Sequence, residues 1–245
     1  MHRFFVDGGC IERSGLSLTD ENAAHAHVLR LAVGEEVVVC DGDGMDYYCT
    51  VTFTSKSATA LRVRDRATNT AEPPMAITLY QALPKTGKMD EIIDKCTQLG
   101  VSRIVPVITA RCVAKASDRD TKKIYRWQKI ALSAARQSQR GRVPQVYDVM
   151  TLSEVLETVG NYDAIFACYE AEDMLSLRAF LQGLPQNPAS IAFFIGPEGG
   201  FAQEEIAKLK ENGVATVSLG SRILRTELAG SVVLANILYE MEGAL

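Results

Sequence analysis

The sequence predicts an α/β fold in which helices cover both faces of a mostly parallel sheet, preceded by a small β-rich domain. Residues 1–72 contain several strand-like segments and few helical ones, and the pair Pro73-Pro74 then interrupts regular structure. From Met75 onwards, short apolar segments alternate with amphipathic segments of helical spacing. Such alternation is typical of a parallel sheet between two layers of helices. We therefore expect two domains, at residues 1–72 and 73–245.

The first domain is expected to be a small β-barrel with few helices. The segments EEVVVCD (35–41) and YYCTVTF (47–53) flank a turn rich in Gly and Asp, which is a hairpin signal. LRVRDRA (61–67) alternates apolar and charged residues, as a half-exposed strand does. A short helix is expected between Thr19 and Ala32.

The second domain is expected to alternate strands with helices up to its last residues. In KMDEIIDKCTQLG (88–100), apolar residues recur at helical spacing and Gly100 ends the helix. Thr151 and Glu154 match a capping box that opens another helix. The expected strands are 75–83, 101–108, 163–169, 190–196 and 214–220. The expected helices are 88–100, a long one from Ser117-Asp118 to about Gln139, 151–160, 202–210 and 229–241.

Composition favours a cytoplasmic protein without structural disulfides. The chain of 245 residues has no apolar run long enough for a membrane helix, and its start lacks the apolar core of a secretory signal. Its six cysteines are scattered without any C-x-x-C spacing, so we expect mostly buried free thiols. The three histidines all precede residue 28 and no cysteines cluster, so no metal site is expected.

Positive charge is concentrated in one part of the second domain, although the net charge of the chain is −4. Residues 111–144 contain only two acidic side chains, Asp118 and Asp120. The same stretch contains these basic residues: Arg111, Lys115, Arg119, Lys122, Lys123, Arg126, Lys129, Arg136, Arg140 and Arg142. Ten positive charges against two negative ones give a local charge of +8, which suits a surface that faces phosphates. The alternative is a solvated helix face.

The loop GPEGG (196–200) follows a buried strand, and ligands of open α/β sheets bind beyond the carboxyl ends of the strands. It matches neither the dinucleotide nor the P-loop motif. Glu198 would repel a pyrophosphate by about 4 kcal/mol per charge pair at 4 Å and an effective dielectric near 20. A ligand with hydroxyls, a purine edge or a positive centre fits better, and S-adenosylmethionine has all three and no phosphate. The alternative is a tight turn in which Glu198 supports the following helix dipole.

Two further segments have unusual residues. In the loop 219–227, Arg222 and Arg225 bracket Ile223-Leu224, which could form a pocket wall around a flat ring or merely plug the core. Thr226 could cap the next helix. The last helix is apolar on nearly every side, which predicts either burial in a homodimer, the reading that we favour, or a deep site within the chain.

Several motifs together resemble one family. FFIGPEGGF (193–201), LGSRILRTELA (219–229), VLRLAVGEEVVVCDGDG (28–44), KMDEIIDKCTQLGVSRIVPV (88–107) and AARQSQRGRVPQV (134–146) are similar to the RsmE family of 16S ribosomal RNA uridine-N3 methyltransferases, in the SPOUT superfamily. The resemblance spans nearly the whole chain. It implies a PUA-like β-barrel for RNA at residues 1–72, a SPOUT domain with a trefoil knot at residues 73–245, a homodimer, and S-adenosylmethionine in the knot.

The resemblance also implies roles for individual residues. The expected cofactor-binding residues are Gly196, Pro197, Glu198, Gly199, Gly200, Leu219, Gly220, Ile223, Leu224 and Arg225, and Tyr169 is added because it lies at the carboxyl end of the strand 163–169. The expected RNA-binding residues are Arg136, Gln137, Arg140 and Arg142. Leu228 departs from the family, which usually has Thr at this position, so any contact of that hydroxyl is missing here.

Methyl transfer to N3 of a uridine requires a base for the N3 proton, a cation for the charge spreading onto O2 and O4, and a rigid alignment of the reactants. Arg225 is the expected cation. Glu198 or Glu227 could accept the proton or orient the cofactor, and the sequence does not choose between them. Two other functions compete: a non-catalytic RNA-binding protein with an empty pocket, and an unrelated α/β enzyme such as a nicotinamide-dependent reductase, against which the missing G-x-G-x-x-G speaks.

Overall fold

The computed structural model describes residues 1–12, 15–85, 87–112, 121–185 and 187–241. The chain forms two compact units, and the first boundary between them lies between Glu72 and Pro73. The segment Ala135–Val143 belongs to the first unit, together with residues 1–72. The sequence had placed this segment in the second domain, because nothing in its residue pattern reveals the polar contacts described below.

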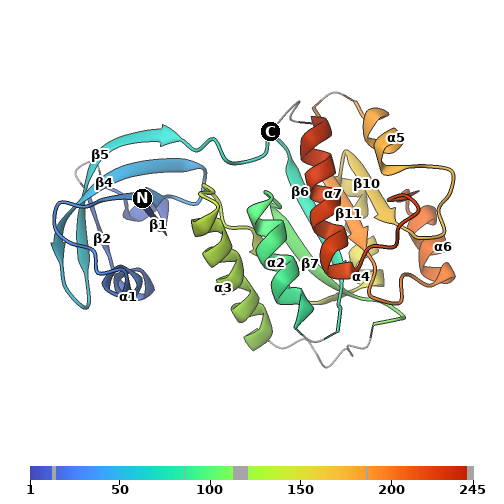
Figure 1. Ribbon diagram of the computed structural model, residues 1–245, viewed down its shortest axis with the longest axis horizontal. Helices are drawn as coiled ribbons and strands as arrows, with labels where there is room; N and C mark the ends of the chain where they lie inside the picture. The colour runs from blue at the N-terminus through green and yellow to red at the C-terminus, as the bar shows by residue number, and fades with distance from the viewer. Residues whose placement is uncertain (13–14, 86, 113–120, 186, 242–245) are drawn as a thin grey trace. The chain divides into compact units, whose positions relative to one another are not determined.

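The first unit is a curled five-stranded sheet with one α-helix (Figure 1). The strand order is β1-β3-β4-β5-β2. The elements are β1 (His2–Phe5), β2 (Leu16–Leu18), β3 (Glu36–Cys40), β4 (Met45–Thr54), β5 (Thr59–Thr68), α1 (Asp20–Val28) and a 3-10 turn (Gly8–Cys10). Two register shifts between β4 and β5 increase the twist of this pair. Phe4, Leu18 and Val37 are fully buried in its core.

The second unit is built on a seven-stranded sheet in the order β12-β10-β11-β6-β7-β8, with β9 also paired to β7. Its strands are β6 (Ala76–Ala82), β7 (Arg103–Ile108), β8 (Gln145–Val146), β9 (Met150–Thr151), β10 (Ala164–Cys168), β11 (Ser190–Ile195) and β12 (Ala215–Val217). All of the pairings are parallel, which confirms the predicted sheet type.

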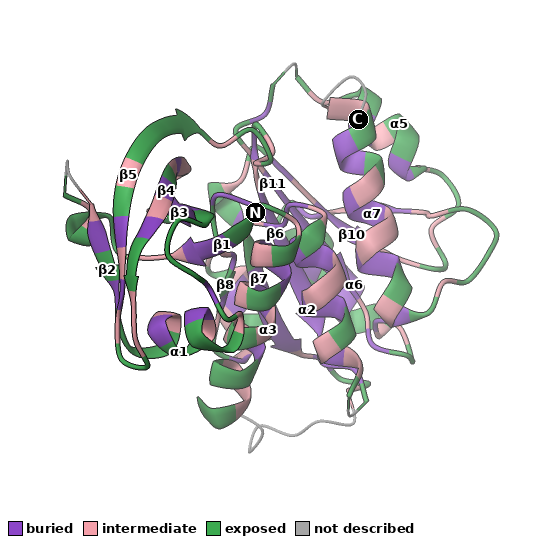
Figure 2. Ribbon diagram, turned by 60° about the vertical axis from the view of Figure 1, so that its left-hand side comes forward, coloured by how far each residue is buried: buried purple, intermediate pink, exposed green. Residues whose placement is uncertain are grey.

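Helices cover both faces of this sheet, as the alternating pattern predicted. They are α2 (Lys88–Gln98), α3 (Thr121–Gln137), α4 (Leu152–Leu156), α5 (Leu177–Gln182), α6 (Gln203–Glu211) and α7 (Thr226–Met241). On one face, Tyr80 and Phe194 stack with their ring centroids 4.5 Å apart, in a cluster with residues of α4 and α6. On the other face, Phe166 contacts Phe180 of α5, and α7 packs against α2. The strands in the middle of the sheet are accordingly buried (Figure 2).

The remaining differences from the sequence concern short elements and helix ends. The predicted capping box of Thr151 and Glu154 is present, but α4 is short and a 3-10 turn (Val159–Asn161) follows it. The expected cap of α3 at Ser117-Asp118 lies outside the described residues. No helix of the described chain is long and apolar enough to cross a membrane. All six cysteines are free: three are buried, two are intermediate and Cys10 is exposed.

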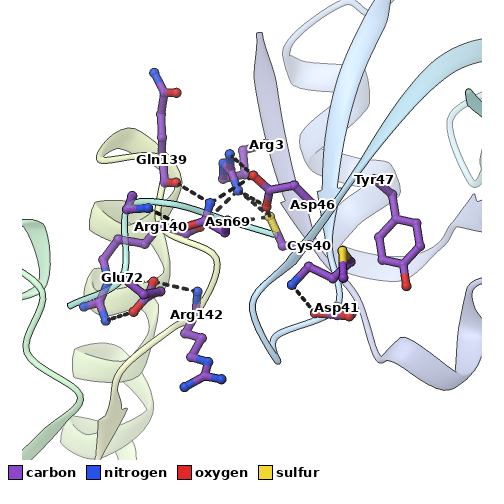
Figure 3. A network of polar contacts seen from close by, with 12 residues as sticks. Arg3, Cys40, Asp41, Asp46, Tyr47, Asn69, Glu72, Gln139, Arg140 and Arg142 are labelled. Carbon is purple, nitrogen blue, oxygen red and sulfur yellow. Dashed lines mark hydrogen bonds and ion pairs between the residues drawn. The ribbon is translucent and has the colours of Figure 1, made fainter. Parts of the chain in front are cut away.

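A buried ion pair lies at the centre of the polar contacts of the first unit (Figure 3). Arg3 donates to both carboxylate oxygens of Asp46, over 2.6 and 2.9 Å. Arg3 also donates to the carbonyl of Arg140, while Asn69 donates to Asp46 and to the carbonyl of Gln139. Burial opposes ionisation of Asp46, but hydrogen bonds from Arg3, Asn69 and Cys40 outweigh it and lower the pKa of this carboxyl. The segment 135–143 is thus bound to the sheet through its main-chain carbonyls.

Arg140, which is expected from the sequence to contact RNA, has a structural partner in Glu72. Its side chain is 2% exposed and donates to both oxygens of Glu72, over 3.1 and 2.7 Å. Glu72 also accepts from the backbone N–H of Arg142. A guanidinium that is buried and bound in this way cannot reach a phosphate without breaking its ion pair, and breaking a buried ion pair is costly.

Candidate active site

A pocket of about 590 Å³ lies in the second unit at the carboxyl ends of β10, β11 and β12, which are neighbours in the sheet. All eleven residues predicted to bind a cofactor line it. The loop after β10 contributes Tyr169, the loop after β11 contributes residues 196–200, and the loop after β12 contributes residues 219–220 and 222–225. The structure therefore brings together three segments that are far apart in the sequence, as the rule for ligand sites in α/β sheets predicts.

The loop 196–200 needs its glycines because the chain folds closely onto itself. Gly200 donates from its backbone N–H to the carbonyl of Pro197 over 2.9 Å. A Cβ on Gly196 would lie 3.2 Å from the Cα of Gly200, and Gly200 has a φ of 68°. Side chains at these two positions would force the turn apart. The pocket is consequently lined here by main-chain atoms.

A buried hydrogen-bond relay joins this loop to the start of α7. The hydroxyl of Thr226 donates to the carbonyl of Gly196 over 2.7 Å and accepts from the side-chain amide of Gln81 over 3.0 Å. Gln81 lies on β6 and is fully buried. The expectation that Thr226 caps the helix is therefore wrong in detail: its hydroxyl ties two pocket loops together at their base.

At the rim of the pocket, one ammonium bridges two carboxylates. Nζ of Lys88 lies 3.1 Å from Oε1 of Glu198 and 3.0 Å from Oε2 of Glu227. Glu198 also accepts from the backbone N–H of Lys85. Glu198 thus points to the turn before α2 and not to the first turn of α6, so it does not serve the helix dipole that the alternative interpretation invoked.

Both carboxylates are held in the ionised form. Burial acts to raise the pKa of Glu198, but its own backbone N–H, Lys88 and the Lys85 N–H outweigh burial, and the pKa is lowered. The pKa of Glu227 is lowered first by its own backbone N–H and further by Lys88 and Arg225. The pKa of Lys88 is raised by the hydrogen bonds to Glu227 and Glu198. The three groups therefore carry a net charge of −1 at neutral pH.

The sequence did not identify Lys88. Lys88 lines the pocket. It is the first residue of α2, directly after the loop that follows β6. Since β6 neighbours β11 in the sheet, the rule of carboxyl strand ends could have pointed to this turn. Its pairing with two glutamates more than one hundred residues away could not be read from spacing.

The loop 219–227 presents an apolar wall and two arginines. Ile223 is 79% exposed, so it does not plug the core, and Leu224 is half-buried. Arg222 and Arg225 are exposed. Within the described part of the chain, the guanidinium of Arg225 makes no hydrogen bond or ion pair, although its charge acts on Glu227. Arg225 is thus available to a ligand that develops negative charge.

The predicted RNA-binding residues lie in the first unit, at the end of α3 and in the segment after it. Gln137 and Arg142 are exposed, and Nη2 of Arg142 donates to the carbonyl of Asp43. Arg136 is half-buried and donates to the side chain of Asn22. Burial lowers the pKa of the Arg136 guanidinium. Among the four, Gln137 and Arg142 are thus the side chains most open to an RNA.

No cluster of three or more His, Cys, Asp or Glu side chains that could hold a metal ion occurs among the residues that the structure describes.

Comparisons with known proteins agree with this geometry. Residues 71–238 match the model of the RNA methyltransferase domain, and residues 18–61 match that of the RNA methyltransferase PUA domain. Ribosomal RNA small subunit methyltransferase E of Bacillus subtilis is 33% identical, over 99% of this chain and 98% of the relative. The protein of the same name from Synechocystis is 35% identical, over 86% and 68%.

A solved structure is also similar over nearly the full length. The crystal structure of a ribosomal RNA small subunit methyltransferase E from Neisseria gonorrhoeae bound to S-adenosyl methionine has a TM-score of 0.87. It is 30% identical, and the alignment covers 97% of each chain. The likeness therefore includes both units.

Proposed function

Because the chain belongs to the RNA methyltransferase family that includes ribosomal RNA small subunit methyltransferase E, we propose that it transfers a methyl group from S-adenosylmethionine to N3 of a uridine in 16S ribosomal RNA. The observation that supports this most directly is the pocket: three loops at adjacent strand ends gather all eleven predicted cofactor residues around one cavity. A related protein was crystallised with S-adenosyl methionine.

The residues of the pocket fit this cofactor. Because Gly196, Gly199 and Gly200 have no side chains, a purine edge or hydroxyls can approach the main chain there, and Ile223 with Leu224 offers apolar contact to a ring. The net negative charge of Glu198, Lys88 and Glu227 suits a cationic ligand and disfavours a pyrophosphate. When bound, S-adenosylmethionine supplies the activated methyl group on its sulfonium.

Arg225 is proposed to stabilise the charge of the uracil ring. As the N3 proton leaves, negative charge spreads onto O2 and O4, and a guanidinium that is already in place stabilises it without reorganisation. The target base must be unpaired or turned out of a helix, because pairing occupies N3. Glu198 and Glu227 have lowered pKa values, so they are weak bases; this favours an electrostatic role toward the cofactor over proton abstraction.

Mapping of methylated nucleotides tests the proposal. Ribosomal RNA from cells with and without the gene is compared, and equilibrium dialysis with labelled S-adenosylmethionine is carried out on the purified protein. We expect one uridine-N3 methylation to disappear with the gene and the protein to bind the cofactor. Cofactor binding without loss of any 16S methylation would refute the substrate. Binding of RNA but not of the cofactor would favour the non-catalytic RNA-binding protein.

The RNA is proposed to contact the exposed side chains of Gln137 and Arg142 in the segment 135–143. Arg142→Ala is expected to weaken RNA binding uniformly and to reduce the slope of log K against log salt by about 1, because one phosphate contact is lost. The measurement is a salt titration of RNA affinity. Thermal unfolding should change little, since the backbone N–H that binds Glu72 remains. An unchanged salt slope would mean that Arg142 does not contact a phosphate and that this part of the basic stretch is only a solvated face.

Three further features belong to this proposal. We expect a homodimer, because α7 buries one face in its own chain while Leu228 and Tyr239, which share the other face, are 43% and 69% exposed. Sedimentation equilibrium measures the oligomeric state directly.

We also expect the loops 196–200 and 219–227 to belong to a trefoil knot. Modification of ribosomal RNA would place the protein in the cytoplasm.

A further inference from the structure

Lys88 joins the two cofactor loops although it belongs to neither. It is the first residue of α2, while Glu198 lies in the loop after β11 and Glu227 lies in the first turn of α7. Its ammonium contacts one carboxylate oxygen of each, at 3.1 and 3.0 Å. These are the only two ion pairs that Lys88 makes with described residues. The roles given to the pocket residues so far do not account for it.

The bridge brings two negative charges close together. Each carboxylate lies about one ion-pair distance from the same nitrogen, so the two would repel each other if that nitrogen were absent. Other groups compensate only in part. The Lys85 N–H remains at Glu198, while the more distant charges of Arg225 and Lys95 act on Glu227.

The turn before α2 fixes where the ammonium lies. Gly87 has a φ of 92°, a left-handed conformation that a residue with a side chain rarely adopts, and Lys88 follows it directly. The same turn makes a second contact with Glu198, because the backbone N–H of Lys85 donates to its carboxylate. Below this rim, the relay of Gln81, Thr226 and Gly196 holds the same two loops at their base. Polar contacts thus join the two loops both at the rim of the pocket and at its base.

We propose that Lys88 is a positioning residue of the cofactor site: its ammonium holds Glu198 and Glu227 side by side and thereby sets the spacing of the loops 196–200 and 219–227 around S-adenosylmethionine. The inference rests on the proposed function for the identity of the ligand. In this arrangement the paired carboxylates present one net negative charge to the cationic ligand, and they do so only while both stay ionised. Lys88 itself transfers no proton.

Removal of the ammonium has two consequences that a merely structural lysine would not share. The carboxylates move apart or one of them takes up a proton, so affinity for the cofactor falls. In addition, the pKa values of both glutamates rise, because Lys88 is among the groups that lower them. Since binding needs the ionised forms, the variant loses affinity at a higher pH than the wild type as the solution is acidified.

The test measures S-adenosylmethionine binding by isothermal titration calorimetry between pH 5 and 8, on the full-length wild type and three variants. We expect Lys88→Met to weaken binding by about fivefold to tenfold at neutral pH, the range of a partly exposed charge contact. Its affinity should fall further below neutral pH while the wild-type curve stays flat. Lys88→Arg should restore most of the affinity and the flat curve.

Lys95→Met is the matched control, because it removes the same charge from the same helix but takes away an ion pair with Glu91. We expect a change of about twofold at most, since this charge reaches Glu227 only over a longer distance. Unfolding temperatures of the ligand-free proteins identify any variant that is merely destabilised. If Lys88→Met is destabilised, the affinity and pH profile of Lys88→Arg are compared with those of the wild type instead.

The outcomes separate this inference from the proposed function. If the wild type binds no S-adenosylmethionine, the proposed function is wrong. If the wild type binds and Lys88→Met matches it in affinity and in pH profile, the positioning role is wrong and the function stands. Tighter binding by Lys88→Met would also overturn the inference, because Lys88 would then be a competitor of the ligand's own cation.

Discussion

Arg225→Ala is expected to lose about a hundredfold to a thousandfold in single-turnover methylation, while affinity for S-adenosylmethionine changes by less than about threefold. Arg225 lines the pocket with an exposed guanidinium that makes no hydrogen bond within the described chain, so its removal leaves no buried partner unpaired. Loss of the guanidinium raises the free energy of the transition state, in which negative charge develops on the uracil ring. A variant that loses turnover and keeps cofactor affinity has lost stabilisation of the transition state.

Arg222→Ala provides the comparison for this variant. Arg222 lies three residues earlier, is also exposed and lines the same pocket. If Arg225 acts by position, Arg222→Ala should reduce turnover much less, and Arg225→Lys should recover part of the rate because it keeps a charge but not the planar donor geometry. Equal losses in Arg222→Ala and Arg225→Ala would mean that the loop contributes only a general positive field. Unchanged turnover in Arg225→Ala would remove the proposed role.

The pocket could be anticipated from the sequence because its parts are local. An apolar strand, a glycine-rich turn and a helix follow each other at 190–211, and each is readable from nearest neighbours. The rule that ligands bind at carboxyl strand ends then places Tyr169, Gly196 and Leu219 at the same edge of the sheet. Gly196 and Gly200 are needed for the close turn itself, so their requirement is also local.

Lys88 and Arg140 have partners that could not be predicted from the sequence. Both are basic residues near helix ends, and charge alone does not reveal which one faces a ligand and which one is buried. The family resemblance assigns Arg140 to RNA, yet its guanidinium pairs with Glu72. The sequence does not single out Lys88, yet its ammonium pairs with Glu198 of the pocket lining and with Glu227. In each case the deciding partner is far away in the chain. The short strands β8 and β9 were missed because two residues carry no periodicity.

The basic stretch at 111–144 therefore divides by function. Arg140 contributes to folding, Arg136 is half-buried against Asn22, and Arg142 remains exposed beside the carbonyl of Asp43. A net local charge counted from the sequence overestimates the surface that can meet an RNA, because charges neutralised by a buried partner add nothing to the external field. Measurements of RNA affinity should accordingly depend on fewer residues than the ten that the sequence offers.

Arg3→Met is expected to lower the free energy of unfolding of the first unit by about 3–5 kcal/mol, because it leaves the carboxylate of Asp46 buried without its cation. The side chains of Arg3 and Asp46 are 7% and 6% exposed, so water cannot replace the lost bonds. Urea unfolding of the full-length protein, followed by circular dichroism, measures the loss. The double variant Arg3→Met, Asp46→Leu should recover most of it, since a buried ion pair contributes little more than apolar side chains of similar volume.

The pH dependence of this effect has a definite sign. The pKa of Asp46 is lower in the folded than in the unfolded chain, so its contribution to stability is complete above the unfolded pKa and is lost as the pH falls through the folded one. As the pH falls, the free energy of unfolding of the wild type should therefore decrease relative to that of the double variant, which lacks Asp46. If Arg3→Met unfolds at the same urea concentration as the wild type, Arg3 and Asp46 do not hold the segment 135–143. The hydrogen bond from Arg3 to the carbonyl of Arg140 would then be dispensable as well.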